Sequence, residues 1–254
     1  MELNYKKFGA GKTIIILHGL FGMLDNWKSF ARKLSKDFEV LIIDQRDHGK
    51  SPHTDAFNYQ LLADDIKKFI DEHNIDLYAI IGHSMGGKTA MQFTVDHPGH
   101  LEKLLVVDIG PNQNPENHRT IFKALKAVPI DTISSRSEAE DVLSKYIDDK
   151  GVRLFLMKNL SRTLKSKYKW KMNLDLLIEN YQEILAEIPF HYPIDTPSLF
   201  IKGDRSNYID HDNIDRIHDV FIHHDIIEIE DAGHWVHADQ ADMLLDKARQ
   251  FLNN

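Results

Sequence analysis

Short aliphatic runs alternate along the chain with segments in which apolar residues recur every three or four positions. Continuous runs predict buried strands at residues 13–17, 39–44, 77–82, 103–108, 198–203 and 225–229, and a short strand at 3–8 precedes them. Helical spacing follows Asn26 and Asn58 and returns in a last helix over 238–252. This alternation predicts an α/β fold, a mostly parallel sheet with helices on both faces.

The alternation stops after Asp108. Residues 111–190 show no strand pattern and predict helices at 121–128, 138–147, 152–160 and 176–188, punctuated by prolines. Such an excursion is too long for an ordinary connection. We therefore expect a helical cap, residues 111–190, inserted into a core of residues 1–110 and 191–254.

Composition narrows the class of protein. Hydrophobic residues make up 42% of the 254 positions, enough apolar surface to offset the entropy of ordering the chain. The longest aliphatic runs are far shorter than the roughly 18 residues of a membrane span. Residues 1–9 lack the apolar stretch of a signal peptide. We therefore expect a soluble, cytoplasmic protein.

Two absences restrict the chemistry. The chain contains no cysteine, which excludes disulfides, thiolate metal sites and a cysteine nucleophile. Its formal net charge of −8 argues against a general nucleic-acid binder, which needs a basic face. We expect a small-molecule substrate as partner and a monomer or small homo-oligomer.

Ser84 lies in the spacing Gly-x-Ser-x-Gly, between Gly82 and Gly86. It follows a predicted buried strand and precedes a predicted helix over 88–95. A serine on such a sharp turn projects from the sheet, and the next backbone N–H faces a developing oxyanion. The alternative is a strand-to-helix turn without chemistry.

A glycine-bearing loop follows the strand at 13–17 and begins at His18. We expect this loop to present the backbone N–H of Leu20 toward the serine turn. Leu20 and Met85 would then form an oxyanion hole. We expect His18 itself to be structural.

Of the 15 histidines, His234 is the candidate base for Ser84, because it comes just after the last strand, where strand ends gather ligands. His237 lies one helical turn further on, and we expect it to face solvent or the cap. His223-His224 and His234-x-x-His237 lack the spacing and acidic partner of zinc motifs, so no metal is expected.

Together these motifs resemble the α/β-hydrolases, and specifically the YbfF-type esterases. The resemblance covers essentially the whole chain, including Trp170-x-x-Asn173 in the cap. The motifs that carry it are His18-Gly-Leu-Phe-Gly22, Asp44-x-Arg46-x-His48-Gly49-x-Ser51, Gly82-His-Ser-Met-Gly-Gly87 and Gly233-His-Trp-Val-His237. The resemblance implies a serine hydrolase acting on acyl esters and thioesters, acyl-CoA among them, without a metal or organic cofactor.

The carboxylate of the triad is not at its commonest place. Many relatives carry it three residues after the glycine that ends the penultimate strand, but here the third residue after Gly203 is Ser206. Asp204 is close in sequence, and its side chain is expected to point away. Asp108 ends the strand beside the nucleophile strand, and YbfF-type esterases share this Asp and this Ser. We predict Asp108 as the acid, with Ser206 an accessory partner of His234; the alternative for Asp108 is a loop cap.

The cap is expected to determine the substrate. Phe21 in the oxyanion loop and Trp170 in the cap are candidate contacts for the acyl group, although cap aromatics also form the cap's own core. Six cations without an acidic residue lie between Lys158 and Lys171, and among them Lys165 and Lys167 are candidates for binding the phosphates of CoA. The alternative is a solvated surface.

Two further functions stay open. A carbon–carbon bond hydrolase or lyase uses the same serine and histidine on the same fold. A ligand sensor of hydrolase ancestry has the same residues but turns over slowly. A substrate panel and a turnover assay separate these from an esterase.

Overall fold

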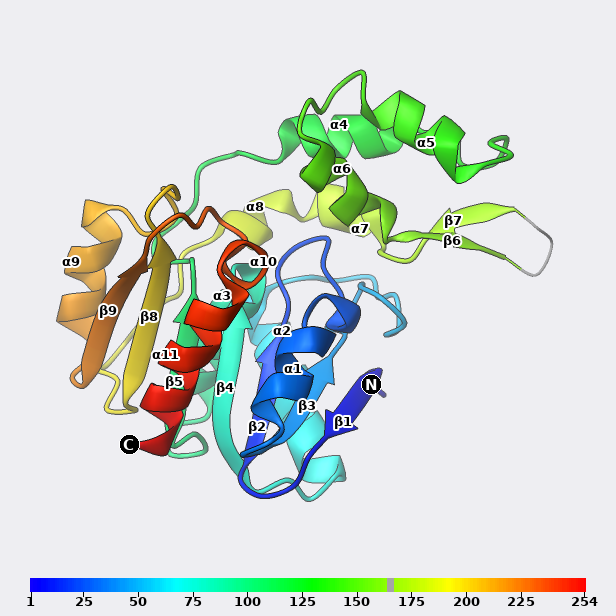
Figure 1. Ribbon diagram of the computed structural model, residues 1–254. Helices are drawn as coiled ribbons and strands as arrows, with labels where there is room; N and C mark the ends of the chain where they lie inside the picture. The colour runs from blue at the N-terminus through cyan, green and yellow to red at the C-terminus, as the bar shows by residue number, and fades with distance from the viewer. Residues whose placement is uncertain (164–166) are drawn as a thin grey trace.

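The core is one seven-stranded sheet in the computed structural model, which describes residues 1–163 and 167–254 (Figure 1). The strand order is β1-β3-β2-β4-β5-β8-β9, and only β1 runs antiparallel to its neighbour. The strands are β1 (Tyr5–Phe8), β2 (Thr13–Leu17), β3 (Glu39–Ile43), β4 (Leu77–His83), β5 (Lys103–Val107), β8 (Ser198–Gly203) and β9 (His224–Ile229). The expected α/β fold with a mostly parallel sheet is confirmed.

The central strands are buried on both faces, which explains their continuous aliphatic sequence. In β2, Ile14 and Ile16 join one hydrophobic cluster, and Ile15 and Leu17 join the other. The first cluster includes residues of α1 (Lys28–Leu34) and α11 (Ala241–Asn253), and the second includes residues of α2 (Tyr59–Glu72), α3 (Met85–Asp96) and α9 (His211–Val220). Helices therefore cover both faces of the sheet.

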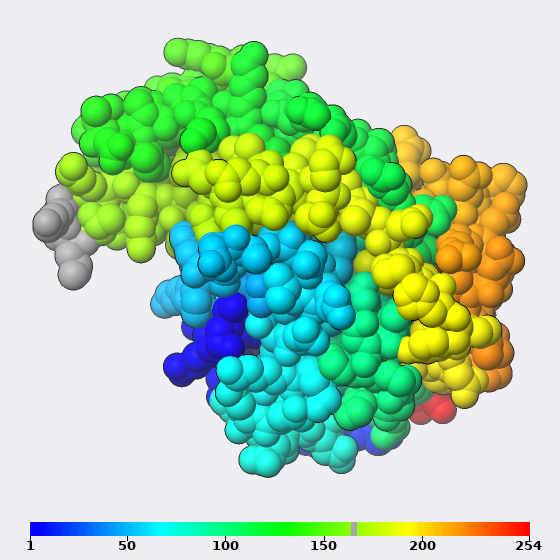
Figure 2. Space-filling view, turned by 180° about the vertical axis from the view of Figure 1, so that it is seen from behind, coloured from blue at the N-terminus to red at the C-terminus, as the bar shows by residue number. Residues whose placement is uncertain are grey.

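The described residues of the cap, 111–163 and 167–190, include helices that lie over the carboxyl ends of the parallel strands (Figure 1), and Figure 2 shows cap residues across the upper end of the core from behind. The cap contains α4 (Arg119–Ala127), α5 (Arg136–Leu143), α6 (Lys150–Met157), α7 (Leu174–Glu179) and α8 (Tyr181–Leu185). The helix expected over 176–188 is divided at Asn180, whose backbone is not helical.

The expectation that the cap contains no strand is wrong. Strands β6 (Leu160–Arg162) and β7 (Tyr168–Trp170) form an antiparallel hairpin, called the cap hairpin below. Each strand has three residues, too few for a periodic pattern to show. Residues 164–166, including the candidate Lys165, lie outside the described residues.

Local sequence signals predict the start of α2 correctly but not the start of the last helix. The Asn58 side chain accepts a hydrogen bond from Leu61 N and caps α2, as its sequence position predicts. The predicted last helix begins earlier, as α10 (Val236–Asp239), and breaks at Gln240 before α11. A 3-10 turn, η1 (Leu24–Asn26), precedes α1. Among the described helices, none is both long and apolar enough to cross a membrane.

Candidate active site

Ser84 occupies a strained turn between β4 and α3. Its φ of 52° and ψ of −121° are unusual for a residue with a side chain. A Cβ at Gly82 would collide with the carbonyl oxygen of Gly86, and a Cβ at Gly86 would collide with that of Leu17. Both glycines are therefore required for the strand and helix to approach closely enough to form this turn.

Three side chains from different strand ends form a continuous hydrogen-bonded chain. The Ser84 Oγ lies 3.0 Å from His234 Nε2, and His234 Nδ1 lies 2.7 Å from Asp108 Oδ2. Asp108 directly follows β5 and is completely buried, and His234 lies in the loop after β9. If Nδ1 carries the proton and donates to the carboxylate, Nε2 is free to accept from the serine hydroxyl.

The carboxylate of Asp108 is held on both oxygens. The Gly203 N–H donates to Oδ1 over 3.0 Å, and the Ser206 hydroxyl donates to Oδ2. Ser206 thus contacts Asp108 and not, as the sequence led us to expect, His234. The side chain of Asp204 accepts a hydrogen bond from Ala232 N, whereas His234 pairs with Asp108.

Two backbone N–H groups near Ser84, those of Leu20 and Met85, are the candidate oxyanion donors. Among the described residues, no hydrogen-bond acceptor is found for Leu20 N or Met85 N. Phe21 N, the next amide of the loop, donates to His48 Nε2. A Cβ at Gly19 would lie 3.0 Å from Ser84 Cβ, so the loop packs directly against the serine.

Neutral histidines contact the loop of residues 18–22 and its neighbour Gln45. His18 Nε2 accepts from Gln45 N at 3.1 Å, and its Nδ1 lies 2.9 Å from Gly19 O. Burial lowers the pKa of His18 to about 4. Burial also lowers the pKa of His48 to about 3, and the nearby His18 ring contributes to this lowering. Both rings are therefore neutral at pH 7, and His18 has the structural contacts that we expected.

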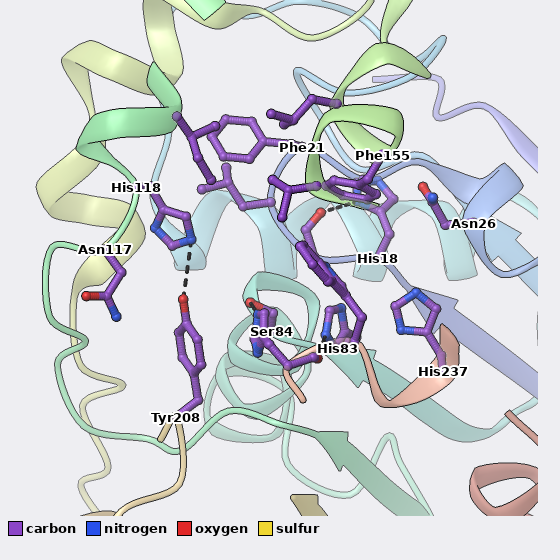
Figure 3. Close-up of a pocket in the computed structure, with 18 of the residues that line it drawn as sticks. His18, Phe21, Asn26, His83, Ser84, Asn117, His118, Phe155, Tyr208 and His237 are labelled. Carbon is purple, nitrogen blue, oxygen red and sulfur yellow. Dashed lines mark hydrogen bonds between the residues drawn. The ribbon is translucent and has the colours of Figure 1, made fainter. Parts of the chain in front are cut away.

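Ser84 and His234 open into a pocket between the core and the cap, called the main pocket (Figure 3). It contains about 820 Å³ of empty space, including space open to solvent. Among the described residues that line it, none is Asp, Glu, Lys or Arg. Its apolar lining consists of Leu20, Phe21, Trp27, Ile121, Val152, Phe155, Leu156 and Trp235.

The sequence does not predict that Tyr208 and His118 line the main pocket, or that His237 does. The ring of Tyr208 stacks on His234. The Tyr208 hydroxyl lies 3.4 Å from Nε2 of His118, a cap residue (Figure 3). Burial lowers the pKa of His118 to about 4 and raises that of Tyr208 to about 12. His237, expected to face solvent or the cap, is half-buried: it stacks on Trp27 and lines the main pocket together with cap residues. No local sequence signal reveals contacts between segments so distant.

The other predicted substrate contacts divide between the pocket and the surface. Phe21 lines the main pocket, with its ring against Phe122 of α4. Trp170 and Lys167 do not line the main pocket. Both belong to the cap hairpin, and Lys167 is exposed there. Within the described ranges, no group of three or more His, Asp or Glu side chains is arranged to hold a metal ion.

This sheet and site have the arrangement of a hydrolase built on an α/β sheet: a serine turn follows β4, a carboxylate follows β5 and a histidine follows β9 at one edge of the sheet. A family model described as "alpha/beta hydrolase fold" matches residues 12–241. The chain belongs to the α/β-hydrolase fold family.

Relatives and solved structures refine the class. A "putative esterase/lipase" of Haemophilus influenzae is 37% identical over 99% of this chain and 88% of its own. The esterase YbfF of Escherichia coli is 34% identical over the whole of both chains. The structure of a marine microorganism esterase has a TM-score of 0.96 and 41% identity, covering 98% of this chain and 99% of its own. The resemblance inferred from the motifs is confirmed, and the chain is of the esterase and lipase type.

Proposed function

We propose that the protein is a serine hydrolase that cleaves carboxylic esters through an acyl-enzyme on Ser84. The observation that carries this proposal is the hydrogen-bonded chain from Ser84 through His234 to Asp108, with the N–H groups of Leu20 and Met85, for which residues 1–163 and 167–254 offer no acceptor. In this reading Asp108 fixes the His234 tautomer and stabilises its charged form. Ser206 orients the Asp108 carboxylate as an accessory residue.

The reaction runs in two acyl transfers. Ser84 Oγ attacks the ester carbonyl while His234 Nε2 takes its proton, and the carbonyl oxygen becomes an oxyanion. The bond to the alcohol oxygen then breaks, and His234 returns the proton to that oxygen. Water next attacks the acyl-enzyme, gives one proton to His234 and releases the acid as Ser84 recovers its hydrogen.

The amides of Leu20 and Met85 would stabilise the oxyanion in both steps. Met85 is the first residue of α3, so its N–H has no carbonyl partner one turn earlier in the helix. Leu20 N belongs to the loop that packs on Ser84. Donors aimed where charge develops in the transition state typically contribute a factor of about 10²–10³ each to turnover.

The main pocket and the relatives both support an ester substrate. Its lining has apolar side chains and neutral histidines, which suit an uncharged, apolar molecule. The relative from Danio rerio, 36% identical over 94% of this chain and 79% of its own, is named an sn-1-specific diacylglycerol lipase.

Acyl thioesters of CoA are a second substrate class with one observation in their favour. Lys158 lies close enough to the main pocket for its charge to contribute to the lowered pKa of His237. A cation there would be within reach of an anionic group leaving the pocket. Lys158→Ala should weaken hydrolysis of acetyl-CoA and spare phenyl acetate; equal effects on both substrates would exclude phosphate recognition.

Hydrolysis of an aryl ester by Ser84→Ala tests the proposed function. We expect turnover to fall by about 10⁴-fold or more, since the nucleophile is removed. Ser161→Ala, on the cap hairpin, is the matched control and should retain wild-type activity. Wild-type turnover by a folded Ser84→Ala protein would overturn the proposal.

A further inference from the structure

Ser84 lies at the junction of two spaces of unequal size. One is the main pocket. The other, called the small cavity, extends beneath the cap, and its far wall consists of the buried residues Tyr59, Ile109, Ile184 and Leu185. Leu20, Ser84, His118 and Tyr208 line both spaces. An ester bound at Ser84 therefore has one space available on each side of its carbonyl carbon.

The direction of proton transfer assigns the two sides of the ester. The leaving oxygen takes its proton from His234 Nε2, so the alcohol group must lie beside that ring. Among the described residues, His234 lines the main pocket and not the small cavity. Met85, whose amide is a proposed oxyanion donor, lines the small cavity instead. The acyl group therefore extends into the small cavity and the alcohol into the main pocket.

The order of product release agrees with this assignment. The alcohol must leave and water must enter while the acyl group stays bound to Ser84. The main pocket has half-exposed residues at its rim, including Val152, Phe155 and Trp235, so it offers an exit on the side where His234 activates water. The small cavity is lined on its far side by the buried Tyr59, Ile109, Ile184 and Leu185, and the half-buried Asn114 also lines it.

The small cavity limits the length of the acyl chain. It contains about 270 Å³ of empty space, against about 820 Å³ in the main pocket, and side chains reach so far into it that there is room for about one water-sized group. A methyl group has that size, and a longer alkyl chain does not fit. The far wall is also held in place, because the Tyr59 hydroxyl donates to the carbonyl oxygen of Ile184 over 2.6 Å and so ties α2 to α8.

We propose that the small cavity is the acyl subsite and that the enzyme is selective for acetyl esters of larger, apolar, uncharged alcohols. The preference for the alcohol follows from the size of the main pocket and from its lining without carboxylates, lysines or arginines among the described residues. Each turnover converts one acetyl ester and one water into acetic acid and the free alcohol.

Two ester series with the unmodified enzyme test the inference. With 4-nitrophenyl acetate, butyrate and octanoate, kcat/KM falls by about tenfold or more at each step, because each longer chain must displace packed side chains. With methyl, hexyl and naphthyl acetate, kcat/KM rises with the size of the alcohol. Octanoate hydrolysed as fast as acetate would overturn the assignment.

A variant of the far wall tests the same assignment independently. Ile184→Ala enlarges the small cavity and should raise the ratio of butyrate to acetate kcat/KM by about tenfold. Leu177→Ala in α7 is the matched control, because Leu177 is equally buried in the cap but lines neither space. It should keep the wild-type ratio. An unchanged ratio in folded Ile184→Ala, or the same change in both variants, would contradict the inference.

The inference rests on the proposed function, and the two fail differently. If Ser84→Ala abolishes hydrolysis but longer acyl chains are preferred, the proposed function stands and the acyl subsite is wrong. If no ester is cleaved, or if Ser84→Ala cleaves esters as well as the wild type, the proposed function fails and the assignment of the subsites fails with it.

Discussion

The ring of Tyr208 stacks on the ring of His234, with the two centroids 3.9 Å apart and the planes 21° from parallel. The Tyr208 hydroxyl in turn lies 3.4 Å from Nε2 of His118, at the start of the cap. The histidine ring is therefore fixed by the Asp108 carboxylate at its edge and by an aromatic ring on its face. Through this contact the cap is linked to the proposed base.

Removing the aromatic ring at position 208 should lower turnover. Aromatic pairs contribute about 0.5–1.5 kcal/mol beyond their buried area, so we expect Tyr208→Ala to reduce kcat by up to about tenfold. Tyr208→Phe keeps the stack and should stay within about threefold of the wild type. Steady-state kinetics of both variants check this, and equal losses would show that stacking does not position His234.

The acid of the triad is tested by ranking two substitutions. Asp108→Asn should lower kcat/KM about thousandfold, because an amide does not hold the required His234 tautomer. Ser206→Ala removes one hydrogen bond to the carboxylate and should cost about tenfold. The kcat/KM of each purified, folded variant on one aryl ester gives the ranking. The reverse order would reject Asp108 as the acid.

Buried histidines should make the protein sensitive to acid. The pKa of His48 is lowered to about 3 in the folded state, whereas in the unfolded chain it returns to about 6.5. As pH falls below 6.5, the unfolded state binds a proton that the folded state does not. The free energy of unfolding therefore falls between pH 6.5 and 3, by up to about 1.4 kcal/mol per pH unit.

Denaturant titrations at pH 7.5 and 5.5 measure this effect. His48→Gln keeps an acceptor for Phe21 N but does not titrate in this range, so it should lose less stability between the two pH values than the wild type. The expected difference is about 1 kcal/mol. An identical loss in both proteins would show that His48 is not kept neutral by the fold.

Lys88 of α3 connects the two ends of the cap. It is completely buried, and its amine donates to the carbonyl oxygens of Asn112 and Ala186, where the cap leaves and rejoins the core. Burial lowers its pKa to about 7. Above pH 7 the unfolded chain holds a proton that the folded state lacks, so the free energy of unfolding rises with pH toward 10.5.

Lys88→Met removes both hydrogen bonds and the titrating group. At pH 8 we expect the free energy of unfolding to fall by about 1–3 kcal/mol, because two carbonyls lose their donor. The rise in stability between pH 7.5 and 9.5 should also disappear. Denaturant titrations across this range measure both quantities, and a variant with the wild-type pH dependence would contradict the pKa of Lys88.

The sequence predicts those parts of the fold that rest on local pattern. The strand β2 has residues buried on both faces, so its aliphatic run is unambiguous. Gly82 and Gly86 mark the serine turn because no other residue fits there. Asp108 and His234 follow from their places after strands, because the carboxyl ends of parallel strands meet at one edge of the sheet.

Contacts made by the cap were not predictable in this way. Tyr208 meets His118 across 90 positions of sequence, and only the placement of the cap over the sheet brings them together. The cap hairpin has strands of three residues, which carry no periodic signal. Ser206 was recognised as part of the site but assigned to His234, because sequence gives the strand end and not the direction of the hydroxyl.

Reaction with an organophosphonate probe tests the central claim, the nucleophilic role of Ser84, most directly. The probe forms a stable bond to an activated serine oxygen, and mass spectrometry of the digested protein locates it. We predict one adduct per chain, on the peptide containing Ser84, and none in His234→Ala or Ser84→Ala treated identically. An adduct on another residue, or full labelling of Ser84→Ala, would contradict the account.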